Sequence, residues 1–179
     1  EGQFYLNTVT DNNQYSNNGW TGLYNVISYA NSVMLDMPEA ARLNGVSDDV
    51  INKALGEAYL FRAVAYYFLT EYWHEVPIID NAEALITSGN VQDIYVPKAT
   101  QRSLYRFICE DLERAVELLP ESDNEPGRVN KWSAKGMLAK VYLTRAVYEK
   151  NHGGYEGDTT DYFELAKSTA KEVITMGPA

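Results

Sequence analysis

The sequence predicts an all-α protein in which about five helices stack as antiparallel pairs. Apolar residues recur every three or four positions in five separate segments. Prolines and glycines end these segments, and no segment alternates apolar and polar residues for long enough to predict a strand. The later helices begin about thirty residues apart, close to the 34-residue period of tetratricopeptide units, so we expect a tetratricopeptide-like stack.

The chain is expected to divide into an irregular lead-in, residues 1–19, and a helical domain, residues 20–179. The lead-in is polar and rich in asparagine, which is typical of loops. The first helix is expected to begin near Trp20 and to be interrupted at Pro38, because proline removes a helical hydrogen bond. A short helical extension then ends at Asn44-Gly45, a strong stop signal.

The second helix has the strongest apolar pattern in the chain. Ser47 and the two aspartates after it supply a cap and negative charge at its start, and Val76-Pro77 ends it in an extended segment. Two apolar stripes predict a helix buried between neighbours. The first stripe comprises Ala54, Ala58, Phe61, Ala65, Phe68 and Tyr72, and the second Leu55, Tyr66, Leu69 and Trp73. Arg62 lies among them, and we expect it to pair with a carboxylate or with helix-end carbonyls, because an unpaired buried charge costs several kcal/mol.

The three remaining helices have ordinary start and stop signals. These signals are Thr100 or Ser103 and Pro120 for the third helix, Asn130 at the start of the fourth, and Asp161, Glu164 and Gly177-Pro178 for the fifth. A glycine-rich loop, residues 151–160, joins the fourth and fifth helices.

Composition excludes several classes of function. Fifteen basic residues oppose twenty-five acidic ones, giving a net charge of −10, and nucleic-acid binding needs clustered positive charge. We therefore expect no nucleic-acid partner. No apolar run is long enough to span a bilayer, and Glu1 opens no signal-peptide pattern. The abrupt ends suggest a piece of a longer protein.

Signals for metals, cofactors and catalysis are weak, and we expect none of the three. The two histidines do not form a zinc motif, and no phosphate loop or nucleophile motif is present. Asp158 and Asp161 offer oxygen ligands for calcium, but the EF-hand spacing is missing and a solvated turn is favoured. Cys109 is interpreted as a small buried hydrophobe rather than a catalytic thiolate.

A family resemblance centres on the second helix. Residues 57–63 read Glu-Ala-Tyr-Leu-Phe-Arg-Ala, and Tyr66-Tyr67-Phe68-Leu69 and Val76-Pro77-Ile78 follow. This series resembles the signature of the SusD/RagB family of Bacteroidetes outer-membrane nutrient-binding lipoproteins. Phe61 stands where leucine is usual, and His74-Glu75 replaces the usual glycine-containing turn.

Other helices resemble that family in the same order along the chain. The matching segments are Trp20 to Asn31, Ile108 to Pro120, Arg128 to Leu143 and Tyr162 to Ile174. The resemblance implies that this chain is the helical, tetratricopeptide-like part of a larger SusD-like fold. It also implies a non-catalytic protein that binds oligosaccharides or other nutrients at the cell surface, with a TonB-dependent transporter as partner in the outer membrane. Membrane contact would come only from a lipid anchor absent from this chain.

Five residues are candidates for glycan binding. Aromatic rings stack on sugars and amide side chains bind hydroxyl groups, and binding groups favour loops. The candidates are Tyr5, Tyr15, Asn18 and Trp20 near the start and Tyr155 in the glycine-rich loop. For Trp20, anchoring of the first helix is the stronger interpretation.

Two other classes of function stay open. A helical-repeat scaffold would hold a peptide or the transporter on its concave face and bind no sugar. A glycosidase would need two carboxylates at a fixed separation in one cleft, whereas the acidic residues here have the spacing of solvated helix faces.

Overall fold

A computed structural model describes residues 10, 13–81, 95–122, 125–154 and 157–177. These residues form the helices α2 (Gln14–Leu35), α3 (Met37–Leu43), α4 (Asp48–Trp73), α6 (Gln101–Leu118), α7 (Lys131–Asn151) and α8 (Tyr162–Met176). The described part of the chain contains no strand, only an isolated bridge between Pro77 and Lys98. The predicted all-α class is confirmed, with five long helices and the short α3.

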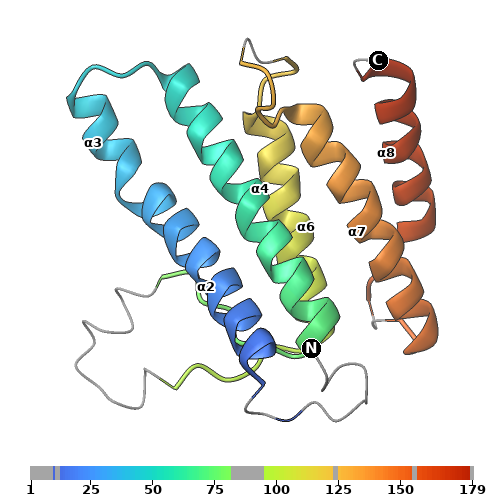
Figure 1. Ribbon diagram of the computed structural model, residues 1–179. Coiled ribbons are helices and arrows are strands. Elements are labelled where there is room, and N and C mark those ends of the chain that lie inside the picture. The colour runs from blue at the N-terminus through green and yellow to red at the C-terminus, as the bar shows by residue number, and fades with distance from the viewer. Residues whose placement is uncertain (1–9, 11–12, 82–94, 123–124, 155–156, 178–179) are drawn as a thin grey trace.

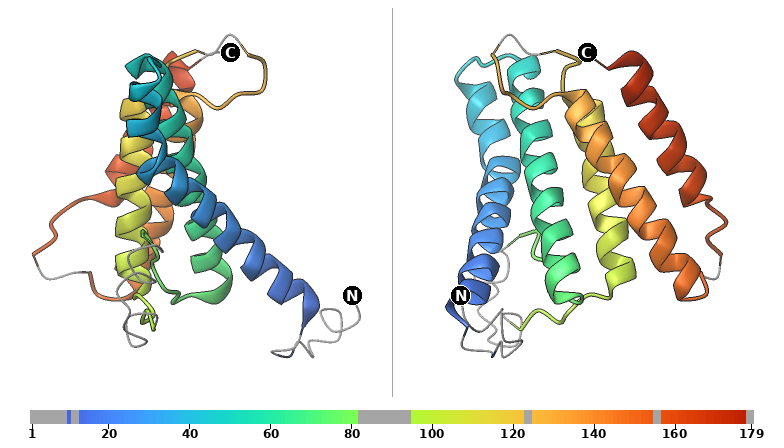
Figure 2. Two further views of the ribbon diagram at one scale, coloured as in Figure 1. Left: turned by 90° about the vertical axis from the view of Figure 1, so that its left-hand side faces the viewer. Right: turned by 45° about the vertical axis from the view of Figure 1, so that its right-hand side comes forward.

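Successive long helices pack against each other. α2 packs on α4, α4 on α6, α6 on α7 and α7 on α8. In Figure 1, α2, α4, α7 and α8 lie in front, and α6 lies behind α4 and α7; the turned views in Figure 2 show the same order. Sequential helix pairs that share a continuous core are the arrangement expected of a tetratricopeptide-like stack.

The first helix begins earlier than the sequence predicts. α2 starts at Gln14, and the Asn13 side chain accepts a hydrogen bond from the backbone N–H of Ser16 at 3.0 Å. The expected irregular lead-in is therefore wrong for residues 14–19, which are helical, while residues 1–9 and 11–12 lie outside the described part. The asparagines that indicate a loop include the residue that caps this helix.

The other predicted helix starts are confirmed in position, but Ser47, the N-cap of α4, makes no side-chain capping hydrogen bond. Thr100 caps α6 by accepting from Ser103 N at 3.2 Å, and Asn130 forms a capping box at the start of α7. The Asp161 side chain accepts from two backbone N–H groups at the start of α8. At α2's end, Pro38 stands in the first turn of α3, where proline is tolerated.

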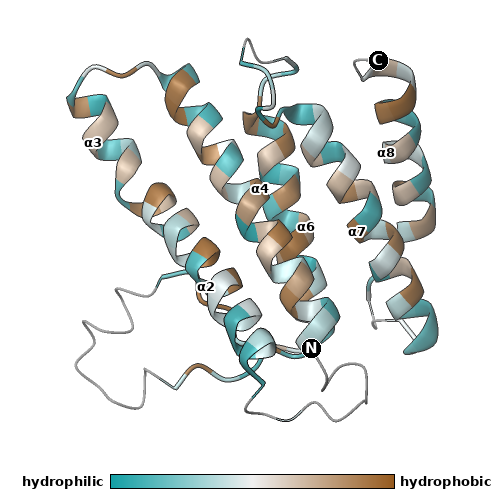
Figure 3. Ribbon diagram, viewed as in Figure 1, coloured by the Kyte–Doolittle hydropathy of each residue, from teal (hydrophilic) through white to brown (hydrophobic). Residues whose placement is uncertain are grey.

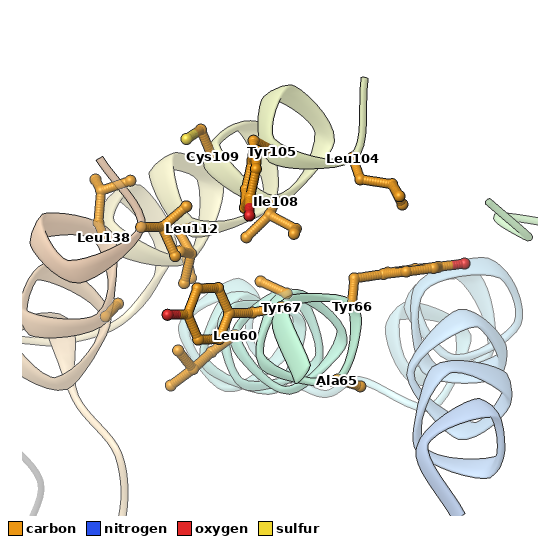
Figure 4. Packing of buried hydrophobic residues seen from close by; sticks show 14 of the residues in the cluster. Leu60, Ala65, Tyr66, Tyr67, Leu104, Tyr105, Ile108, Cys109, Leu112 and Leu138 are labelled. Atoms are coloured by element: carbon orange, nitrogen blue, oxygen red, sulfur yellow. The ribbon is translucent and has the colours of Figure 1, made fainter. Parts of the chain in front are cut away.

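The core lies mainly between α4 and α6. Leu69, Ile108 and Leu112 are fully buried, and Figure 4 shows Ile108 and Leu112 of α6 pointing toward α4. Each such side chain contributes roughly 1.5–3 kcal/mol relative to leaving it in water. At Gly56 of α4, an added Cβ would lie 2.8 Å from Cγ of Leu119, the residue that follows α6.

One predicted face of α4 is not buried. Phe61, Phe68 and Tyr72 are exposed, Phe61 by 47%, and apolar ribbon is visible on the open side of α4 in Figure 3. The second stripe packs as predicted: Tyr66 and Leu69 are buried in the core. α4 has neighbours on the α2 and α6 sides, so the expectation of a helix covered all round was wrong.

Arg62 forms the predicted buried pair. Its Nε and Nη2 donate to the two carboxylate oxygens of Asp111 on α6 at 2.8 and 2.7 Å, and Nη1 donates to Asn31 on α2 at 2.8 Å. Burial opposes the charged form, but the hydrogen bonds and charge of Asp111 outweigh it and raise the pKa of Arg62. One guanidinium thus joins three helices.

Candidate functional site

Tyr15 and Asn18 lie together at the start of α2. They are three residues apart on a helix and are therefore neighbours on its surface. Both are exposed, Tyr15 by 60%. They belong to a helix rather than to the expected loop, and both face solvent.

Trp20 is part of the packing instead. Its ring lies 5.5 Å from that of Trp73 in an edge-to-face arrangement and 4.9 Å from that of Tyr24, centroid to centroid. These contacts fix the start of α2 on the end of α4, as the anchoring interpretation expects. The candidates Tyr5 and Tyr155 lie outside the described residues.

The connection between α7 and α8 borders two neighbouring cavities. The larger one has a volume of about 370 Å³ and the smaller about 300 Å³, the lower end of the range for small-molecule sites. The larger is lined by Ala146, Glu149, Lys150, Gly153, Gly154, Asp158, Thr160, Asp161, Tyr162 and Phe163. The smaller is lined by Arg102, Ser103, Arg106, Arg145, Gly157 and Asp158, and is called the arginine cavity below.

Arg102 of α6 holds this connection in place. Its Nε donates to both carboxylate oxygens of Glu149 at 3.0 Å, and its Nη2 donates to the carbonyl of Gly154 at 2.8 Å. Gly153 and Gly154 have φ angles of +79° and +72°, which L side chains rarely adopt. The glycines predicted as a loop therefore give the backbone the shape that reaches Arg102.

Asp158 lies between the two cavities and accepts hydrogen bonds from three groups. Its Oδ1 accepts from Thr160 N at 3.0 Å, and its Oδ2 accepts from Tyr162 OH at 2.8 Å and from Arg145 Nη2 at 3.2 Å. The hydrogen bonds from Thr160 and then Tyr162 lower the pKa of Asp158. The pKa of Tyr162 is raised to about 12, chiefly because the side chain is partly buried and secondly because its hydroxyl group donates to Asp158.

This arrangement is suited to a polar ligand with hydroxyl groups. Arg145 and Asp158 supply donors and acceptors, and the half-exposed ring of Phe163 lines the larger cavity. The ring of Tyr162 is covered by Arg145, whose Cζ lies 4.0 Å from the ring centroid. Hydroxyl recognition beside an exposed ring is the usual chemistry of sugar sites.

In this region the sequence points to Asp158 and Asp161, as oxygen ligands for calcium, but not to Arg145 or Phe163 as binding residues. Arg145 carried the same signal as Arg62, a guanidinium among apolar residues of a helix, but its partner lies across a loop. Phe163 was missed because it follows a helix cap and shows no periodic pattern of its own.

The calcium alternative finds no support in the described residues. Both oxygens of Asp158 accept hydrogen bonds from protein donors, and Asp161 caps α8. No group of three or more metal-ligating side chains occurs in the described part of the chain. Cys109 is buried, and burial raises the pKa of its thiol to about 12, so it is not a reactive thiolate.

An apolar groove runs between α2 and α4, which lie at the other end of the series of packed helices from α8 (Figure 1). Its volume is about 390 Å³, and it is lined by Val26, Tyr29, Ala30 and Val33 of α2 and by Ala54, Glu57, Ala58 and Phe61 of α4. Exposed apolar surface of this kind marks contact sites in soluble proteins. Among the described helices, none is long and apolar enough to cross a membrane.

Comparison with known proteins decides the family. The family model described as "Starch-binding associating with outer membrane" matches residues 1–143. The chain belongs to the SusD-like family. It is 36% identical over 173 residues to a SusD-like protein of Bacteroides ovatus, an alignment that covers 96% of this chain and 29% of that protein.

Solved SusD-like structures share this fold. A crystal structure described as containing xylogluco-oligosaccharide matches with a TM-score of 0.73 and 30% identity, over 97% of this chain and 32% of that one. A laminarin-binding SusD-like protein matches with a TM-score of 0.68 and 26% identity, over 88% of this chain and 30% of that one. The chain thus spans less than a third of the length of these relatives.

Proposed function

We propose that this SusD-like chain is part of a non-catalytic protein that binds glycans at the bacterial cell surface. The observation that carries the proposal is the family match over residues 1–143, together with SusD-like relatives described with xylogluco-oligosaccharide and as laminarin binding. A TonB-dependent transporter is the proposed partner, and the outer membrane is the proposed location.

Two groups of residues are proposed to contact glycan. Tyr15 and Asn18 form an exposed pair on α2, and Phe163 lies beside the polar cluster around Asp158. Tyr5 and Tyr155 stay candidates from the sequence. Trp20 is proposed to position α2 rather than to bind sugar, because its ring packs against Trp73.

Affinity electrophoresis against soluble polysaccharides tests this proposal. The chain is run through gels that contain xyloglucan, laminarin, pectin or no polysaccharide. Retardation in at least one polysaccharide gel is the expected result. The variants Tyr15→Ala and Phe163→Ala are run beside Tyr29→Ala, whose exposed ring lies on the apolar groove. If Tyr15→Ala or Phe163→Ala is no longer retarded while Tyr29→Ala still is, the affected residue locates the site. If the unmodified chain is not retarded in any gel, glycan binding by this chain is contradicted.

A second candidate function is protein binding by the helical scaffold, and the apolar groove favours it. The groove is proposed to receive the transporter partner. Phe61→Glu would then abolish binding to the purified transporter, while Phe163→Glu would leave it intact, because Phe163 lies on α8 away from the groove. Transporter binding with this pattern, combined with no binding to any glycan, would replace the first proposal by the second.

A further inference from the structure

The arginine cavity concentrates positive charge in an acidic protein. The whole chain carries a net charge of −10, yet three guanidinium groups and one carboxylate line this cavity of about 300 Å³. Arg102 and Arg106 stand one turn apart on α6, and Arg145 reaches the cavity from α7. The lining alone therefore has an excess of positive charge.

The charge of Arg145 is incompletely compensated within the protein. Arg145 is only 7% exposed. Its contact to Asp158 is 3.2 Å long, whereas charge-assisted N–H···O bonds are usually about 2.7–2.9 Å. Asp158 also accepts from Tyr162 and Thr160, so its negative charge is shared among three donors. The buried Nε of Arg145 has no hydrogen-bond partner among the described residues, and a buried donor of this kind calls for an explanation.

Arg106 is held loosely at the mouth of the same cavity. Its nearest carboxylate, that of Glu110, lies 3.8 Å away, and both side chains are about two-thirds exposed. An exposed pair one helical turn apart holds its partners only weakly, so the Arg106 guanidinium is free to turn toward a ligand. Arg102, in contrast, is fixed by Glu149 and Gly154 and forms the wall of the cavity.

We propose that the arginine cavity binds the anionic group of an acidic sugar unit, a uronate carboxylate or a sulfate ester, with Arg106 and Arg145 as its cationic partners. The proposal rests on the proposed glycan-binding function and specifies its substrate class. Guanidinium groups match planar or tetrahedral oxyanions with paired N–H donors. The larger cavity shares Asp158 with this one and holds the Phe163 ring, so the next sugar along the chain packs there.

Calorimetric titration with matched oligosaccharides tests this inference. The chain is titrated with trigalacturonate and with its fully methyl-esterified form, which has the same rings and linkages without the charges. A sulfated oligosaccharide and its desulfated form make a second matched pair. We expect an anionic form to bind about tenfold more tightly than its neutral counterpart, the size of one charge-assisted contact, and salt to reduce the difference. The pair that shows the larger preference identifies the anionic group, a uronate carboxylate or a sulfate ester.

Two variants on one helix give the matched control. Arg106→Gln removes the charge from the cavity and is expected to abolish most of the tenfold preference. Arg114→Gln removes an equally exposed arginine of α6 that pairs with Glu117 outside the cavity, and is expected to keep the preference. Equal binding of the anionic and neutral forms, or equal effects of the two variants, would overturn the inference while glycan binding stands. No binding of any glycan would overturn both.

Discussion

Removal of the Arg62 side chain tests the packing of the helical array most severely. Arg62→Met keeps an unbranched apolar stem but leaves the carboxylate of Asp111 buried without its cation and Asn31 without its donor. Both partners are nearly inaccessible, at 9% and 5% side-chain exposure for Arg62 and Asp111. Breaking a buried pair from one side costs about 3–5 kcal/mol. For a chain of this size the corresponding loss in Tm is roughly 6–20 °C.

Urea unfolding followed by circular dichroism measures this loss. Arg42→Met is the control, because its pair with Asp48 is more than half exposed on both sides and is worth at most about 1 kcal/mol. The double variant Arg62→Met/Asp111→Leu removes both charges and is expected to regain much of the lost stability. A loss below 1 kcal/mol for Arg62→Met, or a double variant that is less stable than Arg62→Met alone, would refute the role assigned to this pair.

Four further substitutions have predicted effects on stability. Gly56→Ala adds a methyl group 2.8 Å from the side chain and 3.1 Å from the backbone N of Leu119, and is expected to destabilise the protein by about 1–3 kcal/mol. Gly136→Ala meets nothing within 4 Å and is expected to stabilise it by up to about 1 kcal/mol. Thermal melts followed by circular dichroism measure both changes. His74 has φ +63°, so His74→Gly is expected to raise stability by about 1 kcal/mol; an unchanged or lower Tm would contradict this. Hydrogen bonds from Thr160 and Tyr162 hold the pKa of Asp158 below its ordinary value of 3.8. The ionised Asp158 therefore stabilises the folded protein fully above pH 3.8. This contribution is lost as the pH falls through the lower pKa of Asp158 in the folded protein. Asp158→Asn is expected to make the free energy of unfolding depend less steeply on pH in this acid range. The same acid dependence in both proteins would argue against this role of Asp158.

Local signals in the sequence predict most of the helix boundaries. Thr100, Asn130 and Asp161 are polar residues directly before apolar periodic runs, and each caps a helix as expected. Asn13 has the same chemistry, but its surroundings are polar on both sides, so composition favours a loop there. The capping bond to Ser16 shows that the cap, and not the composition, decides where α2 begins.

Periodicity identifies which residues share a face but not which face has a neighbour. Phe61 and Phe68 have the same spacing as a core stripe, yet both side chains are exposed, and Phe61 lines the groove between α2 and α4. The partner of Arg62 is likewise predicted by type, a carboxylate, while its identity as Asp111 depends on how α4 and α6 cross.

The cavities near α8 depend on contacts between distant parts of the chain. Arg102 and Gly154 are far apart in sequence and meet only when α6 packs on α7. No local pattern links them, and the arginine cavity could therefore not be predicted before the helices were placed. His74 differs: together with Glu75 it replaces the glycine-containing turn usual in the family, and its φ is positive, a conformation that glycine adopts more readily.

Binding without turnover is the property that most directly distinguishes a nutrient-binding protein from an enzyme. The chain is equilibrated with soluble xyloglucan, laminarin and polygalacturonate, the bound fraction is measured by calorimetry, and the same samples are then examined for shortened oligosaccharides. We expect saturable binding to at least one glycan and no new chain ends after prolonged incubation. Release of shorter products would show an enzyme, and the absence of binding to every glycan would contradict a nutrient-binding role for these residues.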